Sequence, residues 1–276
     1  MASRSKKKAP DTALSKSNFA ACIQTIGIRF GLSKVFDDFL TMAIAACSRN
    51  PVTGLSHYED EYLQTIAPYK GSELRHEFPK AFAYLIDEME TRLKDHLGND
   101  VLGEFFEQQI SNGRNGQFFT PFPVCMMMAA SFYSGRKEKV KDDAVPLRIL
   151  DPTCGSGRMM VAAQRVCGPE HQYYGIDIDR VCVKMTALNM FLHGMWGSEV
   201  MCANALMPDD FVISYRISFL PFGIFKIEQK EQSRLWYMYR NSFSREKKKP
   251  ISDGIIANPV PFHERKRDDG EQLLLF

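Results

Sequence analysis

A short loop between two apolar segments carries the residues best suited to hold a ligand. In ILDPTCGSG (Ile149 to Gly157), Asp151 ends an apolar run, and Gly155 and Gly157 come directly before a helical segment. The glycines allow the backbone to approach a ligand closely, and the N–H groups that start the next helix favour an electron-rich group. The loop is no P-loop, because Arg158 stands where that motif needs Lys. It also lacks the third glycine of the dinucleotide fingerprint, so we expect Asp151 to hold an amino or cationic group.

Two further polar residues follow apolar runs in the same way. Asp177 ends the run YYGID, and Asn204 follows the run EVMCA. The carboxyl ends of parallel strands meet at one edge of a sheet, where an acid can bind the hydroxyls of a ribose. Asn204 could hydrogen-bond an adenine edge or be an ordinary turn residue. Asp179 is better suited to be a helix N-cap than a ligand contact.

A fourth motif, ANPVPF (Ala257 to Phe262), follows the apolar run GIIA. An Asn-Pro step, a second proline and an aromatic suggest a pocket for a base flipped out of a nucleic-acid duplex. Val260 separates the two prolines. Catalytic geometry is sensitive to shifts of about 1 Å, so both a working site and a noncatalytic one stay open.

The elements that must position these motifs are short strands that alternate with helices. RIL, YYGI, EVMCA and GIIA predict four strands, and the helix ahead of EVMCA is expected to end at Gly194. This alternation is typical of βαβ units, so we predict an α/β fold with a parallel, doubly wound sheet. Thr120 as N-cap and Pro121 as first helical residue predict another helix before the first strand.

The first part of the chain has apolar residues at helical spacing from Ser17 to about Ser111, with Ser17 and Ser33 as expected N-caps. One stripe comprises Phe36, Phe39, Leu40, Ala43 and Cys47, and another comprises Phe78, Phe82, Ile86, Met89 and Leu93. We predict a disordered basic tail at 1–16, a helical N-terminal domain at 17–111 and an α/β domain at 112–276. The α/β domain contains an aromatic-rich insert at about 211–250, interpreted as a hairpin or small helical insert that packs locally.

Composition is that of an ordinary globular protein, with 45% hydrophobic residues and a net charge of +2. Nucleic acid would therefore have to be contacted by local basic patches, at Arg4–Lys8, Arg245–Lys249 and His263–Arg267. The seven cysteines show no metal-ligand spacing, which favours reduced, buried thiols and no metal. No apolar stretch could cross a bilayer and the basic start lacks a signal-peptide core, so we expect a cytoplasmic protein without membrane contact.

Six segments stand in an order that is specific in combination: DVLGEFFEQQI, GQFFTP, LDPTCGSG, GIDID, NMFLHG and ANALMPDDF. Together they resemble the modification subunits of type I restriction-modification systems, which are N6-adenine DNA methyltransferases that use S-adenosylmethionine. The resemblance runs from about Asp100 to Phe211 and resumes at Gly254. It implies a Rossmann-like S-adenosylmethionine-dependent methyltransferase sheet, incomplete after the fourth strand and preceded by an all-helical N-terminal domain.

The resemblance also implies roles for individual residues. The cofactor-binding residues would be Phe119, Thr120, Pro121, Asp151, Pro152, Cys154, Gly155, Gly157, Asp177 and Asn204, with Asp177 on the ribose and Asn204 on the adenine moiety. The catalytic residues would be Asn258, Pro259, Pro261 and Phe262. Asn258 and the Pro259 carbonyl would bind the amino group of the target adenine, and Phe262 would stack on the flipped base. The family carries Asn-Pro-Pro-Phe or Asn-Pro-Pro-Tyr at this place, so Val260 frees one φ angle and moves Phe262 by up to about 3.3 Å in an extended chain. The implied partners are DNA and either a specificity subunit or a second chain that completes the sheet.

Three functions remain open at this point. The leading one is an S-adenosylmethionine-dependent DNA methyltransferase of the restriction-modification type, specific for adenine N6. The position of Val260 and the early end of the chain motivate the alternative, a noncatalytic or partial relative that binds cofactor and DNA or a partner subunit. A third function is methylation of a protein amide nitrogen, against which GQFFTP and the helical domain argue.

Overall fold

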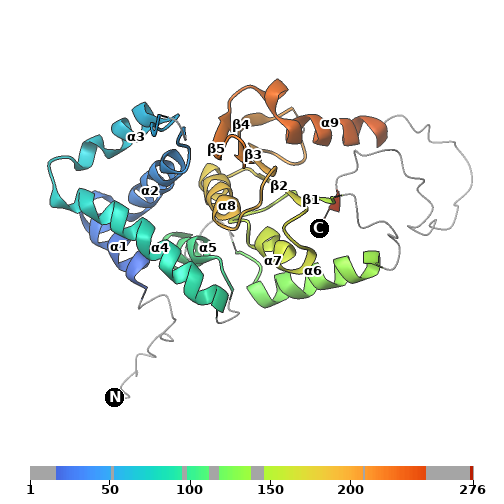
Figure 1. Cartoon of the computed structure of the whole chain (residues 1–276), viewed down its shortest axis with the longest axis horizontal. Coiled ribbons are helices and arrows are strands. Elements are labelled where there is room, and N and C mark those ends of the chain that lie inside the picture. Colours follow the sequence, from blue (N-terminus) through green and yellow to red (C-terminus); the bar gives the residue numbers. More distant parts are fainter. Residues whose placement is uncertain are drawn as a thin grey trace, which may run out of the picture.

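The computed structural model contains a helical region followed by an α/β region (Figure 1). The residues that the structure describes are 17–50, 53–94, 98–111, 118–137, 146–207, 209–246 and 274–275. The predicted tail at 1–16, the predicted fourth strand at Gly254–Ala257 and the ANPVPF motif lie outside the described residues.

The helical region begins with a capped helix. Ser17 accepts a hydrogen bond from the backbone N–H of Ala20 and caps the first helix, as predicted. Gly31, at a φ of 87°, ends that helix, and the next one begins directly after it. Ser33 therefore lies inside a helical turn, and its prediction as an N-cap is wrong. The helices are α1 (Asn18–Phe30), α2 (Leu32–Ala46), α3 (Glu59–Ile66), α4 (Glu77–Lys94) and α5 (Val101–Phe105), with 3-10 turns at Ala67–Tyr69 and Glu73–His76 and a π-helical turn at Phe106–Ser111.

The predicted apolar stripe of α2 is buried from Phe36 to Ala43, whereas the stripe predicted for α4 is wrong in part. Ile86 and Leu93 of α4 are exposed. The helix α4 packs along α1 and buries the side that carries Ala81. The small side chain of Ala81 lets the two helices approach closely. The buried residues of α4 are Phe78, Ala81, Leu85, Met89 and Arg92.

The sheet has the strand order β5-β4-β3-β2-β1-β6. The first three strands run parallel, in a register that pairs Asp151 with Gly175 and Asp177 with Cys202. The predicted βαβ units and the α/β fold are therefore confirmed. An antiparallel hairpin extends the sheet beyond β3, and a two-residue strand that the sequence did not predict pairs with β1. The strands are β1 (Arg148–Asp151), β2 (Gln172–Asp177), β3 (Glu199–Ala203), β4 (Phe211–Ser218), β5 (Gly223–Ile227) and β6 (Leu274–Leu275).

Helices cover both faces of the sheet, as Figure 1 shows for α7 and α9. Successive strand residues point to opposite faces. Accordingly Ile149 belongs to the core that includes α7 and α8, and Leu150 belongs to the core under α9. The helices of this region are α6 (Phe122–Lys137), α7 (Arg158–Cys167), α8 (Arg180–Leu192) and α9 (Arg234–Glu246). The first begins one residue after the predicted Pro121, and α8 ends just before Gly194, as predicted.

The helical region covers the outer edge of β5. Ser48 donates a hydrogen bond to the Ile224 carbonyl at 2.5 Å, and the Lys226 backbone N–H donates to the Tyr58 hydroxyl at 2.6 Å. An edge strand without such partners offers its backbone groups to other chains. The helical region therefore protects the sheet as well as packing on it.

The predicted insert contains the β4–β5 hairpin and α9, and most of its aromatic side chains have packing roles. Trp236 and Tyr239 of α9 are buried against the sheet. At the hairpin tip, by contrast, Phe219 and Phe222 are half exposed and pack on Trp196. The insert is thus largely a part of the sheet and its covering layer.

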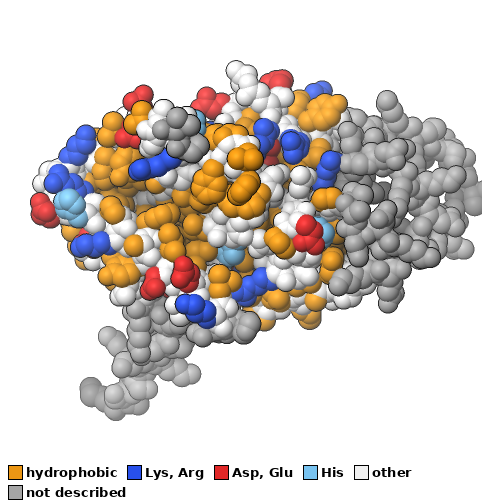
Figure 2. Space-filling model, viewed as in Figure 1, with side chains coloured by type: hydrophobic (Ala, Val, Ile, Leu, Met, Phe, Trp, Pro, Cys, Tyr) orange, Lys and Arg blue, Asp and Glu red, His pale blue; other side chains and the backbone are white. Residues whose placement is uncertain are grey.

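The surface carries mixed charge. Figure 2 shows basic and acidic side chains interspersed over the helical region on this face. Oppositely charged side chains of the helical region also form ion pairs, such as Lys34 with Asp38 and Lys80 with Glu77. All seven cysteines are free and six are buried, in agreement with the predicted reduced thiols. Among the described residues, no cluster of His, Cys, Asp and Glu is suited to a metal ion. None of the helices in this part of the chain is both long and apolar enough to span a bilayer.

Candidate functional site

The loop between β1 and α7 is fixed by its own backbone and by β2. The Asp151 carboxylate accepts the Thr153 N–H at 3.1 Å, and the Cys154 N–H donates to the Ile176 carbonyl at 2.9 Å. Gly155 and Gly157 have φ angles of 55° and 84°, which side-chain-bearing residues rarely adopt. The loop therefore requires glycine at these two positions, and Gly157 is the residue directly before α7.

Asp177 joins this loop to the end of β2. Its Oδ2 accepts the Gly155 N–H at 2.8 Å, and its Oδ1 accepts the Asp179 N–H at 2.9 Å. Each oxygen keeps a further lone pair for a ligand. Asp179 in turn caps α8 by accepting the Val181 N–H, as predicted. The sequence assigned Asp177 only to a ligand, whereas the structure shows that it also holds the glycine loop.

The site is acidic. Burial raises the pKa of Asp151, which is 9% exposed; the Thr153 hydrogen bond opposes this shift and the charge of Asp177 adds to it. Burial also raises the pKa of Asp177, against the hydrogen bonds from the Asp179 and Gly155 N–H groups. Two half-buried or buried carboxylates at one sheet edge favour a ligand that brings hydroxyl and ammonium donors.

The segment Phe119–Pro121 lies against the same loop. A side chain on Gly155 would place its Cβ 2.8 Å from the Phe119 ring, so the aromatic ring rests directly on the glycine. The same ring stacks on Phe106, with centroids 6.0 Å apart. Thr120 and Pro121 are exposed. The structure thus brings Phe119 to the glycine loop, although about thirty residues separate the two in the sequence.

Two of the predicted cofactor contacts act mainly within the protein. Asn204 accepts the Leu206 N–H on Oδ1 at 2.9 Å, so this oxygen stabilises the turn after β3. Its Nδ2 and the second lone pair of Oδ1 are what it could offer to a ligand. The Cys154 side chain is 5% exposed and lies 3.6 Å from the Thr186 hydroxyl, so only its backbone can face a ligand. Pro152, next to Asp151, is half buried.

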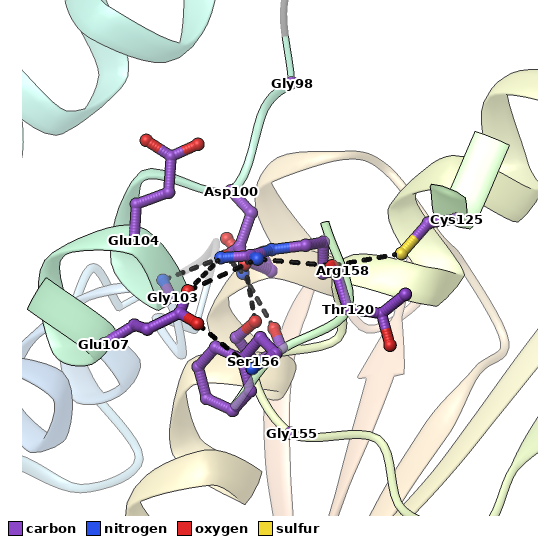
Figure 3. A network of polar contacts seen from close by, with 12 residues as sticks. Gly98, Asp100, Gly103, Glu104, Glu107, Thr120, Cys125, Gly155, Ser156 and Arg158 are labelled. Carbon is purple, nitrogen blue, oxygen red and sulfur yellow. Dashed lines mark hydrogen bonds and ion pairs between the residues drawn. The ribbon is translucent and has the colours of Figure 1, made fainter. Parts of the chain in front are cut away.

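A buried polar network behind the loop was missed by sequence reasoning (Figure 3). Its centre is Asp100, 1% exposed, whose Oδ2 accepts hydrogen bonds from the Ser156 hydroxyl at 2.5 Å and from Arg158 Nε at 2.8 Å. Its Oδ1 accepts from Asn189 Nδ2 and from the Gly103 N–H, each at 2.9 Å. Asp100 and Asn189 lie in DVLGEFFEQQI and NMFLHG, segments that the sequence marked without assigning them a task.

The residues predicted to be catalytic, Asn258, Pro259, Pro261 and Phe262, lie outside the described residues. Among the described residues, the predicted cofactor contacts of β1, β2, β3 and the segment before α6 lie together at the carboxyl edge of the parallel strands. This edge is where open α/β sheets bind their ligands.

Comparison with known proteins gives matches of one kind. The family model described as N-6 DNA Methylase matches residues 97–269, well over half of the chain. The chain is 31% identical over 103 residues to the type I restriction enzyme MjaVIII methylase subunit of Methanocaldococcus jannaschii, covering 35% of the chain and 16% of that protein. It is 25% identical over 153 residues to the type II restriction enzyme and methyltransferase RM.BcgI of Heyndrickxia coagulans, covering 49% of the chain and 23% of that protein.

The chain thus spans less than a quarter of the length of these relatives. Among solved structures, the type I restriction-modification system methyltransferase subunit from Streptococcus thermophilus matches at 17% identity with a TM-score of 0.31. That match covers 64% of this chain and 54% of the other.

Proposed function

Since this chain belongs to the N-6 DNA methylase family, we propose that it transfers a methyl group from S-adenosylmethionine to the N6 atom of adenine in DNA, within a restriction-modification system. The observation that carries the cofactor half of this proposal is the bond from the Gly155 N–H to Asp177, with the Phe119 ring resting on the same glycine. It joins three of the predicted motifs in one site.

The donor set fits S-adenosylmethionine. Asp151 would accept from the ammonium group of the methionine moiety, and the N–H groups that begin α7 would suit its carboxylate. Asp177 has lone pairs left for the ribose hydroxyls, and Asn204 Nδ2 is the candidate contact of the adenine ring. Phe119, Thr120 and Pro121 would line the site around the methionine moiety of the cofactor. Bound S-adenosylmethionine supplies an activated methyl group on a sulfonium sulfur.

The target adenine would be held by the ANPVPF motif. With the cofactor bound, its methyl group would pass to adenine N6, and N6 would release one proton to the solvent. Asn258 and the Pro259 carbonyl would accept the N6 hydrogens, and Phe262 would stack on the base. DNA is the proposed substrate, and a specificity subunit or a second chain is the proposed protein partner.

Calorimetry with S-adenosylmethionine tests the cofactor site. We predict that Asp177→Asn weakens binding at least tenfold, because an amide accepts less well from ribose hydroxyls than a carboxylate does. The matched control is Asp87→Asn, on the exposed side of α4, which should bind like the parent. A parent chain that binds no S-adenosylmethionine, or an Asp177→Asn variant with unchanged affinity, would contradict the proposed site.

Transfer of labelled methyl to DNA tests the catalytic half. The position of Val260 favours one alternative, a relative that binds the cofactor and DNA without methylating it. Label that appears in DNA with the parent and is lost with Asn258→Ala supports methylation. Cofactor binding without label in DNA supports the alternative.

A further inference from the structure

The backbone and the side chain of Arg158 lie in different surroundings. It is the first residue of α7, so its backbone belongs to the helix start that faces the glycine loop. Its side chain is 8% exposed and turns back into the protein, toward α5 and the segment before α6 (Figure 3). The guanidinium therefore stands behind the proposed cofactor site rather than in it.

The guanidinium contacts one short segment in several ways. Arg158 Nη1 donates to the Thr120 carbonyl at 3.3 Å. Its Nη1 and Nη2 also approach Glu107 Oε2, at 3.5 and 3.4 Å, while Glu107 Oε1 accepts the Phe119 N–H at 3.2 Å. Arg158 Cζ lies 5.4 Å from the centroid of the Phe119 ring, within the range of a cation–π interaction. These contacts fix the backbone of Phe119 and Thr120 and the ring of Phe119.

The guanidinium is itself held firmly. Arg158 Nε donates to Asp100 Oδ2 at 2.8 Å, and the same oxygen accepts from the hydroxyl of Ser156 in the glycine loop. Burial disfavours the charge of Arg158, but Asp100 and Glu107 outweigh it and raise the pKa of the side chain. A planar guanidinium presents five donors in fixed directions, which a lysine ammonium does not reproduce. Arg158 thus joins the loop, the π-helical turn and the Phe119–Pro121 segment.

We propose that Arg158 is a positioning residue that holds the Phe119–Pro121 segment on the Gly155 loop and thereby sets the affinity for S-adenosylmethionine without touching it. This inference rests on the proposed function. Its physical basis is preorganisation: a segment already fixed in the free protein does not have to be ordered when the ligand binds.

The chain offers a matched control in Arg92 of α4. The Arg92 side chain is 10% exposed, close to the 8% of Arg158, and it pairs with two acids, Glu88 at 2.7 Å and Glu104 at 2.9 Å. Its remaining hydrogen bond goes to the Gly98 carbonyl, so within the described part of the chain it ties α4 to α5 and not to the Phe119–Pro121 segment. Loss of a buried guanidinium should destabilise both variants, but only the loss at Arg158 should free that segment.

The test compares Arg158→Met, Arg158→Lys and Arg92→Met in two measurements on the full chain. In hydrogen exchange, the Phe119 amide, which donates to Glu107, should exchange about tenfold faster in Arg158→Met and stay protected in Arg92→Met. In calorimetry, Kd for S-adenosylmethionine should rise about tenfold in Arg158→Met, less in Arg158→Lys, and not in Arg92→Met. In methyl transfer, KM for the cofactor should rise while kcat at saturation changes little, which a smaller folded fraction would not produce.

Arg158→Lys, which keeps an ion pair with Asp100, decides the question if Arg158→Met does not fold. Unchanged exchange at Phe119, or unchanged Kd in both Arg158 variants of a parent that binds the cofactor, overturns the inference and leaves the proposed function standing. A parent that binds no cofactor overturns the proposed function and the affinity claim together.

Discussion

Asp151 and Asp177 lie at one edge of the sheet, and burial raises the pKa of both carboxyl groups. Such an acid keeps its proton to a higher pH in the folded protein than in the unfolded chain. A ligand that donates hydrogen bonds to these groups favours their ionised form. Binding near the raised pKa values is therefore coupled to the release of protons.

At this residue scale we predict that the affinity for S-adenosylmethionine increases as pH rises through the raised pKa values and then levels off. Calorimetry in buffers of different ionisation enthalpy measures the released protons, starting at about pH 4, near the ordinary carboxyl pKa. In Asp151 the shift includes the charge of Asp177, so Asp177→Asn should move the remaining inflection to lower pH. Affinity independent of pH while the fold is intact would contradict this coupling.

At the scale of elements, α5 approaches the glycine loop so closely that only glycine fits at one position. A side chain on Gly103 would place its Cβ 2.1 Å from Asp100 Oδ2 and 2.4 Å from the Ser156 hydroxyl oxygen. Both neighbours belong to the buried network that holds the loop. The contact between helix and loop therefore depends on the absence of a side chain.

We predict that Gly103→Ala lowers the free energy of unfolding by about 1–3 kcal/mol, the usual cost of overpacking, although alanine favours helix more than glycine does. Gly71→Ala is the control, because a Cβ there meets nothing within 4 Å. Urea denaturation measures both. Equal stability of Gly103→Ala and the parent would show that the helix and loop separate without cost.

The elements also show why some of the structure could be predicted from the sequence. β1, β2 and β3 and the glycine loop rest on local patterns of apolar, acidic and small residues, which a sequence displays directly. The Arg158–Asp100 pair joins residues 58 positions apart, and the Asn189–Asp100 bond joins residues 89 apart, so no local pattern reveals them. Two local predictions were wrong for a similar reason. The turn at Gly31 makes α2 begin before Ser33, so Ser33 is no N-cap, and the packing of α4 on α1 decides which side of α4 is buried.

At the scale of the whole molecule, one hydrophobic core runs through both regions. It contains Phe36 and Phe105 from the helical region together with Ile149, Val183 and Val200 from the α/β region. The ion pair of Lys184 with Asp37, with Nζ and Oδ1 2.7 Å apart, joins α8 to α2 as well. The two regions are therefore expected to unfold together.

We predict coincident urea transitions by tryptophan fluorescence and far-ultraviolet circular dichroism. Both tryptophans, Trp196 and Trp236, lie in the α/β region, whereas the dichroism also reports the helices α1 to α5. Two-state unfolding makes different probes report one transition. A dichroism change that precedes or follows the fluorescence change would mean that the helical region unfolds by itself.

The hydrogen bonds of Ser48 and Tyr58 to β5 have a practical consequence for anyone who dissects this protein. A fragment cut at residue 97, where the family match begins, would retain all the described strands and lose both of these partners. Its β5 would then present bare backbone donors and acceptors, a known route to aggregation in dissected sheets. The smallest piece worth expressing therefore includes Ser48 and Tyr58, well upstream of the segment that the family model recognises.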